Sequence, residues 1–164
     1  MLIAMLGTAT TFVSCTNDDD DQVYHDQDTI AQVYEIKNVN FDLVDGAHEI
    51  YRQFQTPLYG SDMVLVYRQS AVSNGNPVWE LMPKTMYLAD GNEVDYTFDF
   101  SKEDVYIYAG GTFDIANTEY VRNQTFRVVV VPATLGRGTT TVNYSDYNSV
   151  MQYYYLTDNS VKTF

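Results

Sequence analysis

The chemistry open to this chain starts from Cys15, the only thiol in its 164 residues. The thiol follows an apolar stretch, residues 1–13 with three threonines, and then Ser14; Thr16, Asn17 and four aspartates come after it. A lone cysteine forms no intramolecular disulfide, and a cysteine beside a run of carboxylates suits a protein core poorly. The alternative is a buried N-terminal strand in which the cysteine is incidental. We expect instead that the sulfur is chemically modified.

Residues 1–14 have the composition of an export signal. An apolar run of about 13 residues is shorter than the ~20 that a membrane-spanning helix needs, and it matches the core of a signal peptide. Phe12-Val13-Ser14-Cys15 resembles the lipobox of bacterial lipoproteins, which implies that Cys15 carries palmitate and anchors the mature chain to a membrane. Phe12 is bulkier than the Leu usual at that place. No Lys or Arg precedes the apolar run, so we expect the natural chain to begin a few residues before Met1.

Residues 15–30 are expected to form an acidic tether. A block of like charges with few apolar residues stays solvated and extended. The tract Thr16-Asn17-Asp18-Asp19-Asp20-Asp21 resembles the surface-export signal of Bacteroidota lipoproteins, which implies an outer-membrane protein that faces the cell exterior. A simple solubilising spacer is the alternative. Four consecutive aspartates lack the alternation and the glycine of a calcium loop, so we expect no metal there.

A shorter pattern lies in the same tether. Asp28-Thr29-Ile30 resembles the O-glycosylation sequon of Bacteroidota, in which Asp precedes Ser or Thr and an aliphatic residue follows. An exposed linker is where a modifying enzyme can reach its acceptor, which makes Thr29 a candidate glycosylation site. Three-residue patterns also arise by chance, and that alternative stays open.

Charge and residue counts exclude several classes of function. The net charge is −13, and phosphate backbones would repel such a surface, so nucleic acid is not an expected partner. The chain has two histidines and one cysteine, too few for a typical zinc site, and no cofactor motif. His25 lies in the tether and His48 follows the Asp45-Gly46 turn, and neither has a catalytic partner nearby in the sequence. We therefore predict a protein that is not an enzyme and needs no cofactor.

Aromatic residues provide the other chemistry. There are fifteen tyrosines, and Tyr106, Tyr108 and the run Tyr153-Tyr154-Tyr155 cannot all point inward. Exposed aromatic faces stack on sugar rings and anchor protein interfaces, and Trp79 or the Tyr153, Tyr154 and Tyr155 group is the predicted binding surface. The alternative is that tyrosine merely fills half-buried strand positions, which it favours.

The elements that must position these residues are strands. Residues 31–164 form one predicted domain with period-two patterning between turn signals, and the clearest case is the alternation in residues 94–100. Further strands are expected over residues 34–43, 47–55, 63–67, 78–81, 105–108 and 126–131, with a break near Lys37-Asn38. Turns are expected at Asp45-Gly46, at residues 74–77 and at Asp90-Gly91. About seven strands favour an all-β fold, an antiparallel β-sandwich of the immunoglobulin-like or Greek-key type.

The C-terminal region changes period. Tyr147, Val150, Met151 and Tyr154 follow helical spacing, which predicts one short helix near residues 145–154, capped by Ser145 or Asn143.

The blocks 63–68, 79–91, 96–100, 123–133 and 144–151 together resemble small β-sandwich lipoproteins of Bacteroidota of the Flavobacteriales type. That resemblance implies a location and a sandwich fold, and it brings no ligand-binding residue.

Two classes of function remain after these observations. The first is a lipid-anchored, non-catalytic module that binds an envelope protein or a glycan, and it predicts exposed, clustered aromatic side chains. The second is an accessory glycan hydrolase or a glycan-binding component of a surface uptake system. A hydrolase predicts a cleft with two facing carboxylates whose pKa values differ. The absence of a catalytic constellation in the sequence favours the first class.

Overall fold

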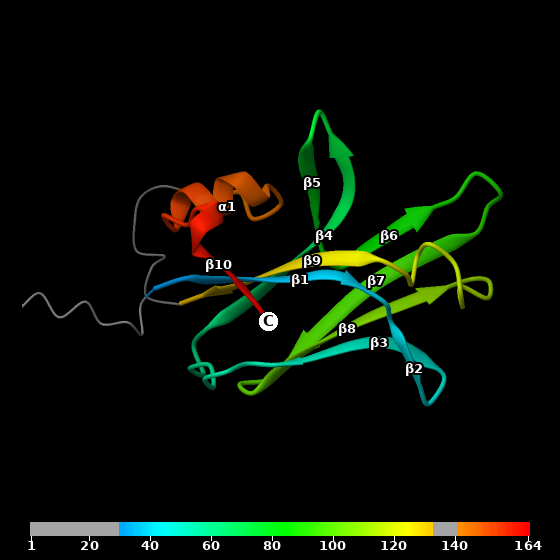
Figure 1. Cartoon of the computed structure of the whole chain (residues 1–164), viewed down its shortest axis with the longest axis horizontal. Coiled ribbons are helices and arrows are strands. Elements are labelled where there is room, and N and C mark those ends of the chain that lie inside the picture. The colour runs from blue at the N-terminus through cyan, green and yellow to red at the C-terminus, as the bar shows by residue number, and fades with distance from the viewer. Residues whose placement is uncertain (1–29, 133–140) are drawn as a thin grey trace, which may run out of the picture.

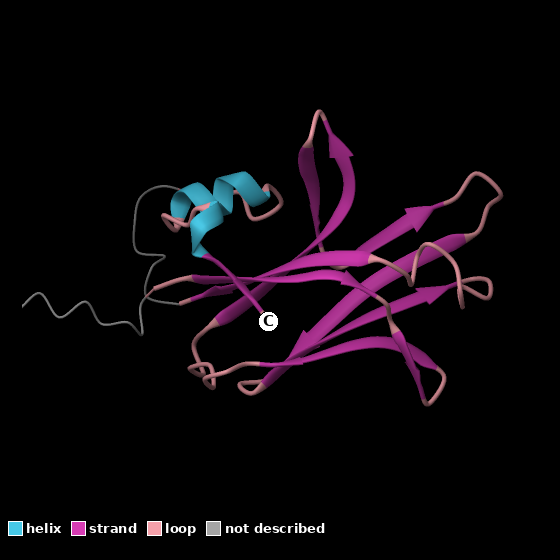
Figure 2. Ribbon diagram, viewed as in Figure 1, coloured by secondary structure: helices cyan, strands magenta, loops and turns pink. Residues whose placement is uncertain are grey.

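The computed structural model describes residues 30–132 and 141–164, which form two five-stranded sheets and a short helix (Figures 1 and 2). An all-β sandwich with a short C-terminal helix is thus confirmed. The elements in chain order are β1 Gln32–Val39, β2 Asp42–Val44, β3 Ala47–Gln53, β4 Met63–Ser73, β5 Asn76–Leu81, β6 Lys84–Tyr87, β7 Glu93–Phe100, β8 Asp104–Gly111, β9 Gln124–Val131, α1 Tyr147–Tyr153, the 3-10 turn Asp158–Ser160 and β10 Val161–Thr163.

The first sheet has the order β10-β1-β9-β4-β5 and the second the order β2-β3-β8-β7-β6. All neighbours are antiparallel except β10, which pairs in parallel with β1 through Val33 and Val161. The described residues form ten strands instead of about seven. The difference includes β10 and the separate short strands β2 and β6, which are three or four residues long and carry little periodic signal.

Two hairpin turns follow the predicted chemistry. Asp45 and Gly46 join β2 to β3 with φ values of 50° and 87°, and Asn74 and Gly75 join β4 to β5 with φ values of 52° and 82°. Two successive residues with positive φ match the right-handed twist of the strands, and Asp, Asn and Gly tolerate that conformation best. The predicted break near Lys37-Asn38 is also present, because the pairing of β1 with β9 shifts between Ile36 and Val39.

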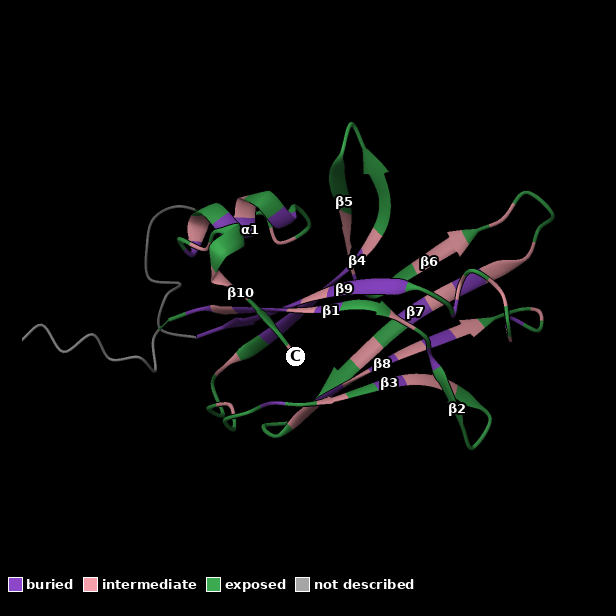
Figure 3. Cartoon of the chain, viewed as in Figure 1, coloured by how far each residue is buried: buried purple, intermediate pink, exposed green. Residues whose placement is uncertain are grey.

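The main core lies between the sheets. Every second residue of β7, β8, β4 and β9 points into it, and Figure 3 shows the buried positions along these strands. Tyr96, Ile107 and Phe126 are among its largest fully buried side chains. Burying an aliphatic or aromatic side chain contributes about 1.5–3 kcal/mol, so this layer, the larger of the two cores, is a main stabilising part of the fold.

A second core joins the outer face of the first sheet to α1. Val129 and Tyr67 pack there against Val150 and Tyr154, so β9 is covered on both faces. The helix begins after Asp146, whose carboxylate accepts a hydrogen bond from the Asn148 backbone N–H at 3.0 Å. The predicted caps Ser145 and Asn143 are therefore wrong. Asn143 instead accepts the Ser145 N–H in the preceding turn.

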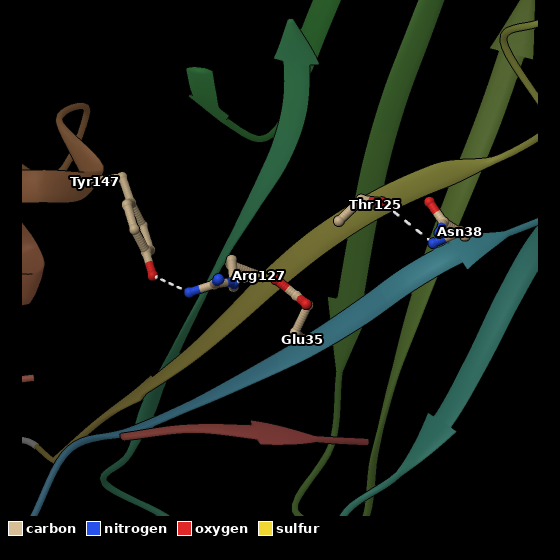
Figure 4. Close-up of polar contacts among 5 residues, drawn as sticks. All are labelled: Glu35, Asn38, Thr125, Arg127 and Tyr147. Atoms are coloured by element: carbon tan, nitrogen blue, oxygen red, sulfur yellow. Dashed lines mark hydrogen bonds and ion pairs between the residues drawn. The ribbon is translucent and has the colours of Figure 1, made fainter. Parts of the chain in front are cut away.

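Arg127 of β9 fixes this helix to the sheet (Figure 4). Its Nε lies 2.7 Å from Glu35 Oε2 on β1, and its Nη1 donates to the Tyr147 hydroxyl at 2.7 Å. The guanidinium also lies over the Trp79 ring, 5.0 Å from the ring centre. One side chain thus connects two strands and the helix through charge, hydrogen bonding and ring contact.

Candidate functional site

The outward face of the second sheet carries the clearest cluster of accessible aromatic side chains. In β8, Val105 and Ile107 point into the core, so Tyr106 and Tyr108 point outward by strand alternation. The neighbouring strand β3 places Tyr51 directly opposite Tyr106 on the same face. We call Tyr51, Tyr106 and Tyr108 the tyrosine row.

The three rings of the tyrosine row form a continuous surface. The Tyr51 and Tyr106 ring centres are 4.9 Å apart with a 48° tilt, and those of Tyr106 and Tyr108 are 6.0 Å apart and nearly parallel at 7°. Tyr51 is 42% exposed, while Tyr106 and Tyr108 are half-buried. Helix α1 packs on the other sheet, so within the described residues it leaves this face open (Figure 1).

Carboxylates surround the row. The Tyr108 hydroxyl donates to Asp99 Oδ2 at 3.2 Å, although Asp99 is paired with Tyr106 in the sheet. The Tyr108 ring therefore leans diagonally across β8 and β7. Asp95 lies over Gly110 of β8, where a Cβ atom would come within 2.8 Å of its Oδ1. Gly110 thus gives the carboxylate room to lie on the neighbouring strand.

The acidic surroundings also affect the tyrosine hydroxyls. Desolvation by neighbouring groups, the hydrogen bond to Asp99 and the negative charges of Asp99 and Glu49 raise the pKa of Tyr108 to about 12. Desolvation and then the charge of Asp104 raise the pKa of Tyr106. Both hydroxyls therefore keep their protons at neutral pH and can donate hydrogen bonds.

This arrangement is suited to binding a ligand that is both flat and rich in hydroxyl groups. Aromatic rings offer apolar contact area, while Asp95, Asp99 and Glu49 supply hydrogen-bond acceptors beside it.

Asp90, a carboxylate in the exposed turn between β6 and β7, has a lowered pKa because the Asn92 side chain and backbone hydrogen-bond to it. That contact stabilises the turn between β6 and β7.

The aromatic residues named from sequence lie elsewhere. Trp79 is half-buried on β5, with its ring centre 5.3 Å from that of Tyr147. Tyr154 is buried in the second core, and Tyr153 packs against it with ring centres 4.9 Å apart. Tyr155 is 92% exposed. Three of these four side chains thus hold α1 against the sheet, and they do not form one accessible surface.

Tyr51 of the tyrosine row was missed at the sequence level. The outward phase of Tyr106 and Tyr108 can be inferred from the alternation of Val105, Ile107 and Ala109. The proximity of Tyr51 depends on the register between β3 and β8, which no local pattern specifies.

Other predicted sites have the following positions. His48 lies on β3, and its buried Nδ1 has no hydrogen-bond partner. Across residues 30–132 and 141–164, no three His, Cys, Asp or Glu side chains come together as a metal site would require. None of the helices in that same part of the chain has the length and hydropathy to span a bilayer. The remaining predicted residues lie outside the described parts of the chain. They are Cys15, Asp18, Asp19, Asp20, Asp21, His25 and Thr29.

Comparisons with known proteins were made at three levels. Neither the family models, nor the curated proteins, nor the solved structures contain a match to this chain.

Proposed function

We propose that this chain is a lipid-anchored, non-catalytic module that binds a neutral glycan on the tyrosine row. The observation that carries the proposal is the run of three neighbouring tyrosine rings on an open sheet face, bordered by carboxylates. Sugar rings present apolar C–H faces to aromatic side chains and hydroxyl groups to carboxylates, so both parts of the surface have a counterpart in the ligand.

Charge favours a neutral saccharide over an acidic one at this face. Desolvation and then the negative charges of Asp104, Glu49 and Asp99 raise the pKa of Tyr106, and these charges would repel a carboxylated or sulfated sugar. Hydroxyl groups of a neutral sugar donate to these carboxylates without that repulsion.

The test compares glycan binding by the full chain, purified in detergent, with binding by single variants. Tyr106→Ala and Tyr108→Ala are each expected to weaken binding to a neutral polysaccharide about fivefold, because a lost aromatic contact costs about 1 kcal/mol. Tyr155→Asn is the matched control, since Tyr155 is an exposed tyrosine far from the row and Asn tolerates its φ of 55°. Affinity electrophoresis on a panel of neutral polysaccharides provides the measurement.

Three results would contradict the proposal. Equal retardation of the wild type and the row variants on every polysaccharide would show that the row binds no glycan. Release of reducing ends from a neutral polysaccharide would support the hydrolase alternative instead. A protein crosslinked through Tyr106 on intact cells, with no glycan binding, would assign the face to envelope assembly.

The anchor is the second part of the proposal. The Phe12-Val13-Ser14-Cys15 sequence and the acidic tract behind it support lipidation and display on the cell exterior. Labelled palmitate should enter the wild-type protein and not the Cys15→Ala variant, and protease added to intact cells should degrade the wild-type domain. Equal labelling of both proteins would reject the anchor without affecting the glycan test.

A further inference from the structure

A polar groove lies beside the β4–β5 hairpin, and Figure 1 shows this hairpin projecting away from the two sheets. It has a volume of about 610 Å³, within the range of about 300–1,000 Å³ typical of small-molecule sites. We call it the Arg68 groove. Its lining residues come from five strands and the segment before β9, and they are Asn38, Arg68, Gln69, Ser70, Ala71, Val72, Glu80, Lys84, Met86, Glu119, Tyr120, Asn123, Gln124 and Thr125.

Arg68 is the unusual residue of this groove because it is buried and has no carboxylate partner. It follows Val64 and Val66 on the inward face of β4 and is 9% exposed. The described ion pairs of the chain are Lys84 with Glu80 and Arg127 with Glu35, and neither includes Arg68. Burying a charge is costly unless other groups compensate it, so the contacts of the guanidinium matter.

The contacts of Arg68 hold its guanidinium in place without neutralising its charge. The guanidinium lies 4.4 Å from the centre of the Tyr96 ring, and Nε donates to Gln124 Oε1 at 2.8 Å. The Gln124 amide is itself oriented, because its Nε2 donates to the backbone carbonyls of Glu119 and Arg122 at 2.6 and 2.8 Å. Gln124 is therefore a positioning residue for Arg68.

The guanidinium has five N–H donors, and its described contacts use three of them. Nε donates to Gln124, Nη1 contacts the weak acceptor Met86 Sδ at 3.7 Å, and a side-chain hydrogen bond joins the guanidinium to the Tyr96 hydroxyl. Within the described parts of the chain, His48 Nδ1 is the one fully buried side-chain polar atom without a partner. No nitrogen of Arg68 is therefore both buried and without a partner, and the residue lines the groove. Nη1 and Nη2 together form the planar fork that binds a carboxylate with two parallel hydrogen bonds.

We propose that the Arg68 groove binds the carboxylate of an acidic sugar. The charges of Glu80 and Lys84 offset one another at 3.6 Å, and the other charged residues that line the groove are Arg68 and the exposed Glu119, between which no ion pair is described. Amide and hydroxyl groups of Asn123, Gln69 and Ser70 line the rest of the groove and suit the hydroxyls of a saccharide. This site stands apart from the tyrosine row, whose carboxylates disfavour the same ligand.

The test is calorimetric titration of the full chain in detergent with glucuronate, galacturonate and N-acetylneuraminate, each beside its uncharged counterpart. At least one acid should bind about tenfold more tightly than its neutral form. Arg68→Met should abolish that preference, and Arg68→Lys should weaken binding about tenfold because Lys lacks the fork. Lys102→Gln is the matched control: it removes one positive charge from an exposed residue outside the groove.

Two further variants test the proposal. If Arg68→Met does not fold by circular dichroism, Ala71→Trp fills the groove from an exposed position and should abolish binding of the acid. Tyr106→Ala should leave acid binding unchanged, which separates this site from the tyrosine row. The proposal is overturned if no acid is preferred over its neutral form, if Arg68→Met and the wild type bind alike, or if inorganic phosphate binds more tightly than every sugar acid.

Discussion

At the scale of single residues, Arg127 shows how a charge can be placed inside an acidic β-sandwich. Its side chain is 11% exposed and that of Glu35 is 22% exposed, so water screens their interaction only in part. The hydrogen bond to Tyr147 and the face of Trp79 occupy the remaining sides of the guanidinium. Arg127 thus couples the ion pair of the sheet to the position of the helix.

Arg127→Met is expected to lower the free energy of unfolding by about 2–3 kcal/mol, because it leaves Glu35 and the Tyr147 hydroxyl without their partner. Urea unfolding measures the change. Tyr147→Phe removes only the hydroxyl, and the double variant should show a coupling of about 1 kcal/mol between the two positions. Strictly additive losses would mean that Arg127 and α1 are independent. The exposed Arg122→Met should change stability by less than about 0.5 kcal/mol.

Residue patterns in the sequence could predict part of the candidate sites. Alternation places Tyr106 and Tyr108 on one face of a strand and Val105 and Ile107 on the other, which is a local property of β8. The buried state of Arg68 depends on distant partners: Gln124 is 56 positions away and Tyr96 belongs to the other sheet. Such contacts follow from strand pairing, which the local sequence does not encode.

At the scale of elements, the residue types in the turns determine where the hairpins form. Pairing between segments far apart in the sequence determines the strands at the edges of the sheets. Asp45-Gly46 and Asn74-Gly75 have the residues that their backbone angles require, so both turns could be predicted. Strand β10 has three residues and no periodic pattern, and it exists because Val161 pairs with Val33, 128 positions earlier. Long strands with a buried face were therefore predictable, whereas the short edge strand was not.

The helix illustrates the same division. Its apolar positions Val150 and Met151 follow from spacing, and both side chains are buried in the second core. Three polar residues near its start are of types that favour helix caps, so each could mark where the helix begins: Asn143, Ser145 and Asp146. Asp146 is the cap because Asn143 and Ser145 hydrogen-bond to each other one turn earlier. The sequence thus predicted the helix, and the competing local bonds decided where it begins.

At the scale of the whole molecule, the helix and the two sheets form three layers, and the two proposed sites lie on different parts of the surface. Helix α1 covers the first sheet, and the second sheet leaves the tyrosine row accessible on the opposite side (Figure 1). The Arg68 groove is lined by the β4–β5 hairpin, β6 and the start of β9. The two proposed sites therefore lie on different parts of the surface, and the two proposals together assign a neutral and an acidic saccharide to one domain.

Buried tyrosines make the stability of the whole molecule sensitive to alkaline pH. Burial raises the pKa of Tyr96 to about 12, and its hydroxyl donates to the Tyr120 carbonyl at 2.8 Å. Burial also raises the pKa values of Tyr67 and Tyr154. The unfolded chain loses these protons near pH 10, before the folded chain does. The stabilisation is therefore fully present below pH 10 and is lost as the pH rises toward 12 and beyond.

The expected outcome is a urea midpoint that stays level from about pH 7 to 9 and falls steeply above pH 10, with Tyr96 contributing roughly 1–2 kcal/mol. Ultraviolet absorbance should show Tyr67, Tyr96 and Tyr154 ionising only as the circular dichroism signal is lost, because burial raises their pKa values. Tyr96→Phe should make the fall shallower, because Phe cannot ionise in the unfolded chain. The exposed control Tyr155→Phe should leave the slope unchanged. A single ionisation near pH 10 in a chain that remains folded would contradict the burial of these hydroxyls.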